Sequence, residues 1–600
     1  MLRSLHELYS LLTHGQRRRL VFLQILVVLM ACAEVAAVVA IGPFMAIVGD
    51  ISRLQEDGII ADIYNGSGFQ DPYSFLFWLG IGVLITLTIS TMISIYTVWR
   101  LSLYGQKIGA ELSIRLYKHY MKQPWLFHSR GSSNQLTSKI SQECTRITDK
   151  VIAPIMKMNA KVVMVTFMAT AVFVFNPRVA VIGVLTFFAS YVLLYRTVRK
   201  KLASDGQMIS RTQDERFQLM AEGFGGIKDA LLLGRQGIFN KRFEASSLAL
   251  GRARGTSKGL SEVPRYAMEL IAFGSVIFLI LYLLTAHHGD LGKLLPVLSV
   301  YALAGLKLLP AFQQIYMSVS TIRSNLSAFD SIRDDLIASR YTGMSYSQDP
   351  AGAGRLIPQD SVALNNVSFR YPGKDESALS GLSLEIPANH VIGLVGPSGS
   401  GKSTAIDMLL GLIDPDEGSL TIDNRAITSD TKRAWQNSVG FVPQTIFLAD
   451  ASIRENIAFG LPNEQIDDVK VAKSVCLAHL DDLITSLPEG LDTRVGERGI
   501  QLSGGQRQRI GIARALYDDA KVLILDEATS ALDGITEKNV MDAIHDFSGK
   551  KTIVMVAHRL ATVRRCDKIY FIDNGHVVDS GSYDELVNNN VVFQKMAKYA

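Results

Sequence analysis

Residues 391–404 read VIGLVGPSGSGKST, and this stretch decides the fold of the second half of the chain. The five residues VIGLV, four of them apolar, predict a buried β-strand, and a loop with the pattern G-x-x-x-x-G-K-S follows it directly before a helix. Glycines in such a loop let backbone N–H groups turn onto phosphate oxygens, while the lysine neutralises phosphate charge. The stretch therefore predicts an α/β domain with a phosphate-binding loop, whose expected ligand residues are Gly396, Ser398, Gly399, Ser400, Gly401, Lys402, Ser403 and Thr404.

A second apolar strand ends in two acids, Asp526 and Glu527, in the stretch VLILDE. We expect Asp526 to join Ser403 in holding Mg²⁺, and Glu527 to orient or deprotonate an attacking water. Two acids after a strand can also simply open a helix, where negative charge is favourable. The phosphate loop in the same domain favours the catalytic interpretation.

A third motif, Leu502–Gln506, reads LSGGQ and precedes a basic helical run. Serine and two glycines at a helix start make another anion-binding terminus. One nucleotide needs only one such anion-binding site. The phosphate loop already provides it, so the role of the second site is left unexplained.

The LSGGQ motif resembles the signature sequence of ABC transporters, and further motifs of that family follow along the chain. The resemblance implies that the cofactors are ATP and Mg²⁺ and that Ser503, Gly504, Gly505 and Gln506 contact the ATP of a partner chain. It also implies roles for four single residues and one loop. These are Tyr371 (stacking on adenine), Gln444 (Mg²⁺ and water), Asp533 (dimer seam), His558 (γ-phosphate, catalytic) and Thr493–Gly499 (contact with a partner's helices).

The first 320 residues hold most of the apolar residues of a chain that is 48% apolar, with a mean hydropathy of +0.20. A membrane span needs about 20 apolar residues. Six stretches qualify and predict an α-helical membrane domain of six transmembrane helices. They are about 20–48, 74–99, 151–175, 178–198, 266–285 and 293–320.

Positive charge predicts the orientation of these spans. Arg17, Arg18 and Arg19 precede the first span, whereas acids dominate the first outer loop. Both termini and the ATPase domain are therefore expected in the cytoplasm. Within that outer loop, residues 51–64 carry apolar residues at helical spacing, which leaves an amphipathic helix and an ordinary loop as equal alternatives.

Charged residues in membrane spans are costly, so each is a functional candidate. Arg265 and Lys307 are our candidates for a basic cavity that receives an anionic head group. One alternative is that Arg265 pairs with Glu269, four residues further along the chain. Another is that the lysines, including Lys157 and Lys161, extend their charged ends to the membrane–water interface. Glu34, in the first span, is a weaker candidate.

Six spans followed by one ATPase domain is the layout of exporter-type half-transporters, so the resemblance covers the whole chain. It implies a homodimer that works by alternating access, with coupling through turns at 124–128 and 224–228. The expected domains are a membrane domain over 1–325, a linker over 326–360 and an ABC-type nucleotide-binding domain over 361–600.

The membrane half is also similar to bacterial lipid-linked oligosaccharide flippases, through the region around Glu34, the outer loop, Arg265 and Lys307. This similarity implies membrane lipid and a polyprenyl-pyrophosphate-linked glycan as partners, in the bacterial inner membrane. The alternatives are an exporter of phospholipid, lipid A, peptide or drugs, and a regulatory ATPase that transports nothing. A net charge of +5 is too small to suggest nucleic acid, and the four cysteines form no C-x-x-C pair.

Overall fold

The chain divides into two compact units in the computed structural model. The first unit consists of Met1–Gln123 and Arg130–Tyr346, and the second of Pro124–Ser129 and Ser347–Ala600. Pro124–Ser129 thus packs with the second unit although it lies inside the first in sequence. The structure describes residues 2–49, 51–54, 59–131, 133–175, 177–286, 291–340, 354–496, 502–528, 534–557 and 560–599.

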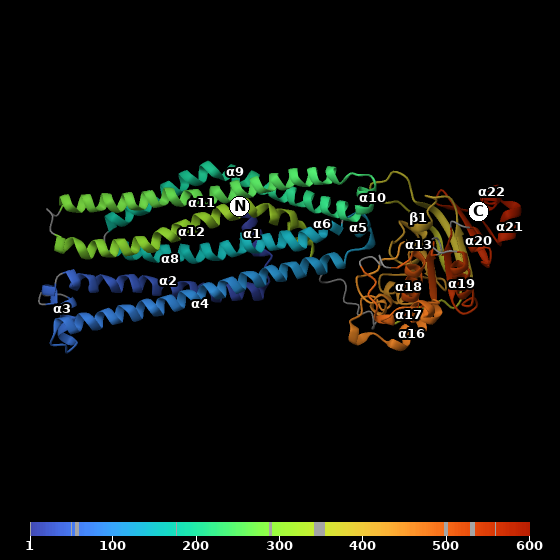
Figure 1. Cartoon of the computed structure of the whole chain (residues 1–600), viewed down its shortest axis with the longest axis horizontal. Helices are drawn as coiled ribbons and strands as arrows, with labels where there is room; N and C mark the ends of the chain where they lie inside the picture. Colours follow the sequence, from blue (N-terminus) through green and yellow to red (C-terminus); the bar gives the residue numbers. More distant parts are fainter. Residues whose placement is uncertain are drawn as a thin grey trace. The chain divides into compact units, whose positions relative to one another are not determined.

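The first unit is a bundle of long helices that run side by side (Figure 1). Sequence signals set their ends: α4 begins with Pro72 at its first turn, and the Asp71 carboxylate accepts hydrogen bonds from the backbone N–H groups of Tyr73 and Ser74. The bounds are α1 (Leu2–Ser10), α2 (His14–Gly49), η1 (Ile51–Leu54), α3 (Ile59–Gly66), α4 (Pro72–Met121), α9 (Pro177–Gly225), α10 (Ile227–Leu232), α11 (Gln236–Ala286) and α12 (Leu291–Ala338).

The remaining long helix of this unit changes its pitch twice. It is built from α6 (Ser133–Ser138), η2 (Lys139–Glu143), α7 (Cys144–Ile147), η3 (Thr148–Ile152) and α8 (Ala153–Phe175). The two η segments are π-helical, a wider form that is frequent at functional sites.

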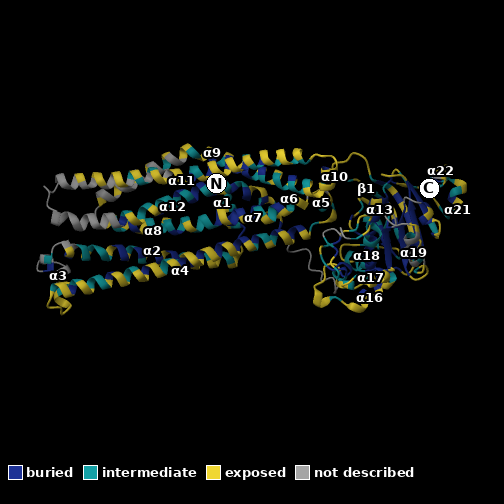
Figure 2. Cartoon of the chain, in the orientation of Figure 1, coloured by how far each residue is buried: buried dark blue, intermediate teal, exposed yellow. Residues whose placement is uncertain are grey.

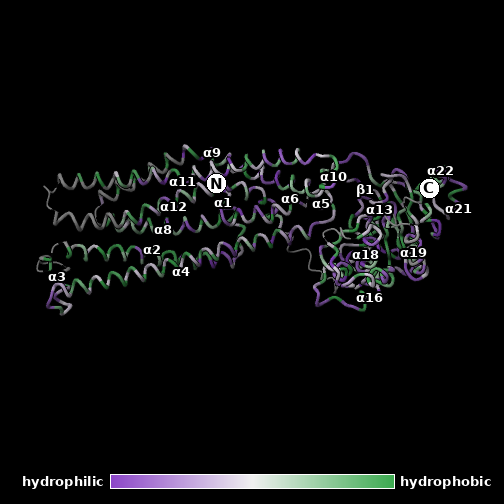
Figure 3. Tube along the Cα trace, in the orientation of Figure 1, coloured by the Kyte–Doolittle hydropathy of each residue, from purple (hydrophilic) through white to green (hydrophobic). Residues whose placement is uncertain are grey.

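Three helical stretches among the described residues are long and apolar enough to cross a membrane: His14–Met45, Pro72–Met121 and Ser133–Val174. They contain the first three predicted spans, apart from the last few residues of 20–48 and residue 175. The predicted spans 178–198, 266–285 and 293–320 lie on α9, α11 and α12, parts of which fall outside the described side chains. The long helices change from hydrophobic to hydrophilic along their length (Figure 3), as expected for helices that continue past a bilayer.

The first outer loop contains two short helices, η1 and α3, so the helical alternative holds for the residues described there. Its residue Leu54 packs inward in a buried cluster with Ile47 and Phe75, and Tyr64 lies edge-on to Phe75, whereas Ile63 is exposed. The predicted linker of 326–360 begins too early, since α12 continues to Ala338. The part of that linker over 341–353 lies outside the described residues.

The second unit holds two sheets and the helices around them. One sheet has the order β2-β1-β4-β5 and is antiparallel; the other has the order β10-β9-β3-β8-β7-β6, with β10 the antiparallel edge. The strands are β1 (Ser361–Phe369), β2 (Leu379–Pro387), β3 (Val391–Val395), β4 (Glu417–Ile422), β5 (Arg425–Ala426), β6 (Val439–Val442), β7 (Val522–Asp526), β8 (Thr552–Val556), β9 (Lys568–Asp573) and β10 (His576–Gly581).

Buried residues gather on the strands of this unit (Figure 2). Alternate residues of β3 face opposite sides: Val391 packs into a core with the helices, while Ile392 packs into a second core with the smaller sheet. The central strands β3 and β8 are buried along their whole length, and apolar residues predominate in them, as is usual for strands covered on both faces. The helices and helical turns are α5 (Trp125–Arg130), α13 (Lys402–Leu409), α14 (Lys432–Gln436), α15 (Ile453–Ile457), η5 (Asn463–Gln465), α16 (Asp468–Leu477), α17 (Asp481–Ser486), η6 (Gly490–Asp492), α18 (Gly504–Leu516), α19 (Gly534–His545), α20 (Leu560–Val563), α21 (Tyr583–Asn589) and α22 (Val591–Tyr599).

Candidate nucleotide site and membrane charges

Four neighbouring strands place the candidate nucleotide site at one edge of the larger sheet. Strands β3, β8, β7 and β6 are parallel, so their carboxyl ends meet at the same edge. The phosphate loop follows β3, the pair Asp526–Glu527 ends β7, and Gln444 follows β6. The topology thus gathers motifs that lie up to about 130 positions apart in sequence, as ligand sites in such sheets are gathered.

Glycine is required at two positions of the phosphate loop. At Gly396 a Cβ atom would lie 1.9 Å from the backbone oxygen of Ile572, which leaves no room for any side chain. Gly401 has φ of +104° and caps α13 in a left-handed conformation that other residues rarely adopt. The loop therefore turns tightly into the first turn of α13, where free N–H groups favour an anion.

The ammonium group of Lys402 lies folded back under this loop. It donates hydrogen bonds to the backbone oxygens of Gly396 at 2.9 Å and Pro397 at 2.7 Å, and the residue is buried. Burial lowers the pKa of Lys402, although the nearby carboxylates of Glu527 and Asp526 act in the opposite direction. A phosphate would supply the opposite charge that a buried ammonium favours, so the site fits a polyphosphate.

The acid and amide groups at the other strand ends lie in contact. Gln444 donates from Nε2 to Oε2 of Glu527 at 2.7 Å. Glu527 has φ of +49°, a left-handed conformation that is strained for a residue with a side chain. Strain of this kind is typical of functional positions, and here it follows directly after the last residue of β7.

The aromatic residue Tyr371 lies beside the phosphate-loop helix. Its ring packs edge-on to Phe369 with centroids 5.0 Å apart, and its hydroxyl lies 3.3 Å from Oγ1 of Thr404. The structure therefore brings Tyr371 to the same region as the phosphate loop.

The LSGGQ motif opens α18 with a capping box. The Ser503 hydroxyl accepts from the backbone N–H of Gln506, and the Gln506 side chain accepts from the backbone N–H of Ser503. Gly504 and Gly505 form the first turn of the helix. Among the described residues no hydrogen bond joins this motif to the phosphate loop.

Three predicted elements fall wholly or partly outside the described residues. They are His558, Asp533 and residues 497–499 of the Thr493–Gly499 loop. In sequence, His558 comes two positions after β8, the strand that lies between β3 and β7.

The structure adds one contact that sequence reasoning missed. Trp125, in α5, donates from Nε1 to Oδ2 of Asp407 on the phosphate-loop helix at 3.2 Å. Burial raises the pKa of Asp407 to about 6, while the Trp125 hydrogen bond opposes this shift and Asp526 adds to it. Leu126 packs against the core beneath the same helix. The turn predicted at 124–128 thus contacts α13.

The charged residues of the membrane helices lie in different surroundings. Arg265 donates from Nε to Glu269 at 2.8 Å, and Gln313 donates to the same carboxylate oxygen at 3.3 Å. Lys307 is exposed on α12. The Arg265 and Lys307 side chains are both exposed.

A cavity of about 250 Å³ lies among α2, α4, the α8 helix and α12, and Lys157 and Lys161 both line it. Gln314, from α12, lines it as well. Nearby on α2, Glu34 is buried and accepts a hydrogen bond from the Ser94 hydroxyl at 3.0 Å. The two lysines lie four positions apart on one helix and so share one face, and this face borders the cavity.

Comparison with known proteins identifies the family. A model of the ABC transporter transmembrane region matches residues 20–304, and a model of the ABC transporter domain matches residues 379–530. The chain belongs to the ABC transporter family. The two matches cover more than two thirds of the transporter, and they coincide with its helical bundle and with the domain that carries the phosphate loop.

Curated relatives match the transporter along most of its length. It is 26% identical over 569 residues to the ATP-dependent lipid A-core flippase of Ralstonia nicotianae, with 93% of this chain and 92% of the relative covered. It is 28% identical to the flippase of the same name from Cupriavidus metallidurans, with 90% of each covered, and 27% identical to that of Escherichia coli K12, with 89% and 90% covered.

A solved structure also matches the transporter. It is that of a bacterial Atm1-family ABC exporter with ATP bound, with a TM-score of 0.79, 25% identity, and 97% and 98% of the two chains covered. This confirms the predicted fold class, an exporter-type helical domain joined to an ABC nucleotide-binding domain. The transporter is an ATP hydrolase whose reaction is coupled to transport.

Proposed function

We propose that the transporter flips a phosphorylated glycolipid across the bacterial inner membrane, with a polyprenyl-pyrophosphate-linked oligosaccharide as the first candidate substrate. The observation that carries this proposal is the cavity lined by Lys157 and Lys161 within a predicted span. Cations are costly inside a bilayer and suit an anionic head group there. Arg265 and Lys307, on the neighbouring long helices, are further candidates for contact with a pyrophosphate.

A second candidate substrate is a lipid A-core glycolipid. The relatives that match over about nine tenths of the chain are flippases for this lipid. Both candidates combine apolar chains, phosphate and sugars, so the same cationic cavity suits either head group.

We propose the following roles at the nucleotide site. The backbone of Gly396–Gly401 and the Lys402 ammonium hold the phosphates of ATP, and Tyr371 lies against adenine. Glu527 orients and deprotonates the attacking water, with Gln444 fixing its carboxylate through the 2.7 Å hydrogen bond. His558 contacts the γ-phosphate. Mg²⁺ would be held by Ser403, Gln444 and Asp526, and it neutralises charge on the phosphates.

The LSGGQ motif, at the start of α18, supports a head-to-tail homodimer. We propose that Ser503–Gln506 of one chain closes on the ATP held by the phosphate loop of the other, with Asp533 at the seam. The segment 224–233 contains the second of the two predicted coupling turns. It exposes several apolar side chains that suit the surface of a partner chain. These are Phe224, Ile227, Leu231, Leu232 and Leu233.

Closure of the two ATPase domains would then drive alternating access. The helix α5 would carry this movement to the long helices. Because Trp125 contacts Asp407 on the phosphate-loop helix, a change in the loop is transmitted to the helices that continue from α5. In this scheme both termini and the ATPase domain face the cytoplasm.

The test is ATPase activity of the purified transporter in phosphatidylcholine nanodiscs, with polyprenyl-pyrophosphate glycan, with lipid A, or with neither. We expect stimulation by the pyrophosphate glycan that disappears in K157Q/K161Q and in E527Q. Basal activity should survive in K157Q/K161Q but not in E527Q. Stimulation by lipid A alone would select the second candidate, and stimulation by neither would refute the proposed substrate class.

A further inference from the structure

A large polar cavity lies inside the helical unit, apart from the nucleotide site and from the cavity of Lys157 and Lys161. It has a volume of about 710 Å³ and is bounded by η2, α7, η3, α9, α11 and α12. Small-ligand pockets commonly measure about 300–1,000 Å³, so its size suits a ligand. Apart from Ile209 and Met317 its lining side chains are polar or charged, so it does not suit an acyl or polyprenyl chain.

Two of the cations that line this cavity form no ion pair with any described residue. Arg146 has Glu143 at 3.5 Å, and Lys258 has Glu262 at 4.0 Å. Lys150 and Arg254 also line the cavity, and in the part of the chain that the structure describes neither makes an ion pair. The remaining acid, Asp149, accepts a hydrogen bond from Gln106 at 2.8 Å.

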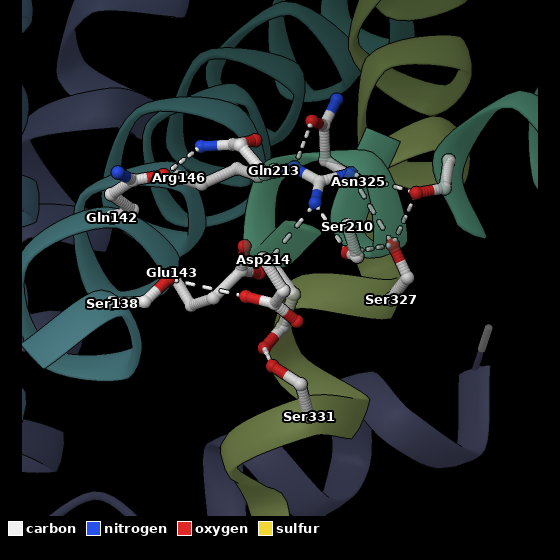
Figure 4. A network of polar contacts seen from close by, with 12 residues as sticks. Ser138, Gln142, Glu143, Arg146, Ser210, Gln213, Asp214, Asn325, Ser327 and Ser331 are labelled. Atoms are coloured by element: carbon white, nitrogen blue, oxygen red, sulfur yellow. Dashed lines mark hydrogen bonds and ion pairs between the residues drawn. The ribbon is translucent and has the colours of Figure 1, made fainter. Parts of the chain in front are cut away.

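Arg146 links the helices that line this cavity, and Figure 4 shows its polar contacts. Its guanidinium donates to Oγ of Ser210 at 2.6 Å, to Oδ1 of Asn325 at 2.8 Å and to the backbone oxygen of Gly206 at 3.2 Å. Arg146 is only 8% exposed, so α7, α9 and α12 are joined around one buried group. The helices that line the cavity are therefore held together by buried hydrogen bonds.

The wall of the cavity also contains a buried hydrogen-bond acceptor, the side-chain oxygen of Gln213. The Gln213 side chain donates from Nε2 to Gln142, and both residues line the cavity. Its Oε1 atom is buried and accepts no hydrogen bond from any described residue. An unsatisfied buried acceptor is costly, and a ligand hydroxyl would satisfy it.

We propose that this cavity binds a phosphate-bearing sugar, with Arg254 and Lys150 contacting the phosphate and Gln213 accepting a hydrogen bond from a sugar hydroxyl. Two cations suit a doubly charged phosphate, and arginine can contact it through two parallel hydrogen bonds. The head group of a glycolipid and a soluble sugar phosphate both offer this chemistry. Binding here requires no transport, so the proposal stands apart from the substrate proposed above.

The test uses the full-length transporter in phosphatidylcholine nanodiscs, with glucose 1-phosphate as the probe and isothermal titration calorimetry as the measurement. Every variant also carries K402A, so that the phosphate loop does not contribute binding. We expect K150Q/R254Q to weaken binding about tenfold or more, since charge-assisted hydrogen bonds are the stronger class. Q213L should weaken glucose 1-phosphate but leave inorganic phosphate unaffected, because only the sugar offers the hydroxyl.

A matched control removes two exposed cations that do not line the cavity, Lys241 and Arg252 on α11. K241Q/R252Q should bind glucose 1-phosphate as tightly as the K402A parent. Absence of binding in that parent, or equal binding in both double variants, overturns the proposal. Nanodiscs that contain lipid A separate the two sources: competition with the probe selects a lipid head group, and unchanged binding selects a soluble sugar phosphate.

Discussion

Asp407 is the residue at which the phosphate-loop helix contacts the segment Pro124–Ser129, which packs within the same unit. Its carboxylate lies on the phosphate-loop helix and accepts a hydrogen bond from Trp125. Sequence motifs identified the loop because strand, glycines and lysine are contiguous. They did not identify this pair, because Trp125 and Asp407 lie 282 positions apart and only the fold brings them together.

The raised pKa of Asp407, about 6 against an ordinary value of 3.8, gives stability a predictable pH dependence. A raised folded-state pKa means that the contribution of this group to stability is fully present below about 3.8 and is lost as the pH rises through about 6. D407N keeps a hydrogen-bond acceptor but cannot ionise. We therefore expect its melting temperature, relative to the wild type, to increase between pH 5 and pH 7.5.

Thermal unfolding of the transporter in detergent, followed by intrinsic fluorescence across that pH range, measures this difference. D482N serves as the control, because Asp482 is an exposed aspartate at the start of α17, outside the contact between Trp125 and Asp407. A D407N difference that is the same at every pH would contradict a buried carboxyl group at this position.

At the scale of elements, the close approach of α9 to α12 depends on Gly206. A Cβ atom there would lie 2.1 Å from the backbone oxygen of Ser324, and the Gly206 carbonyl also accepts from Arg146. Hydropathy predicted that both helices exist, since each carries a long apolar stretch. It could not predict which small residue permits their contact, because that depends on how the helices cross.

We expect G206A to destabilise the helical unit by about 1–3 kcal/mol, the usual cost of overpacking a tight contact. The backbone of α12 must move, since the obstructing atom is not the end of a flexible side chain. The matched control is G259A on α11, where a Cβ atom meets nothing within 4 Å. There alanine should be neutral or slightly stabilising, because glycine is a poor helix former. Equal melting temperatures for the two variants would show that α9 and α12 do not approach so closely.

Each chain of the transporter contains an LSGGQ motif, but we expect each nucleotide site to need this motif from a second chain. The phosphate loop, Glu527 and Gln444 meet within one chain, whereas no hydrogen bond among the described residues links Ser503–Gln506 to them. Sequence reasoning predicted both halves of this arrangement, because each motif is local. It could not show their closure, which by this account takes place between two chains.

Mixed dimers test that account directly. S503R blocks the motif at the start of α18, and E527Q removes the proposed base. If the motif acts on the partner's ATP, an S503R chain paired with an E527Q chain retains one complete site: the phosphate loop and Glu527 of the first with the motif of the second. We therefore expect co-expressed, doubly tagged S503R/E527Q heterodimers to hydrolyse ATP at about half the wild-type rate if the sites act independently, a simple site count for a two-fold dimer.

The reciprocal pairing provides the control, since it contains the same two substitutions. When both are placed on one chain and the other chain is wild type, neither site is complete, and hydrolysis should fall to the level of the E527Q homodimer. A motif that acted on the ATP of its own chain would give the opposite pattern, with activity in this second dimer and none in the first. Phosphate release from the two purified heterodimers therefore decides whether ATP joins two copies of this chain, and with it whether closure of the ATPase domains can drive the helices.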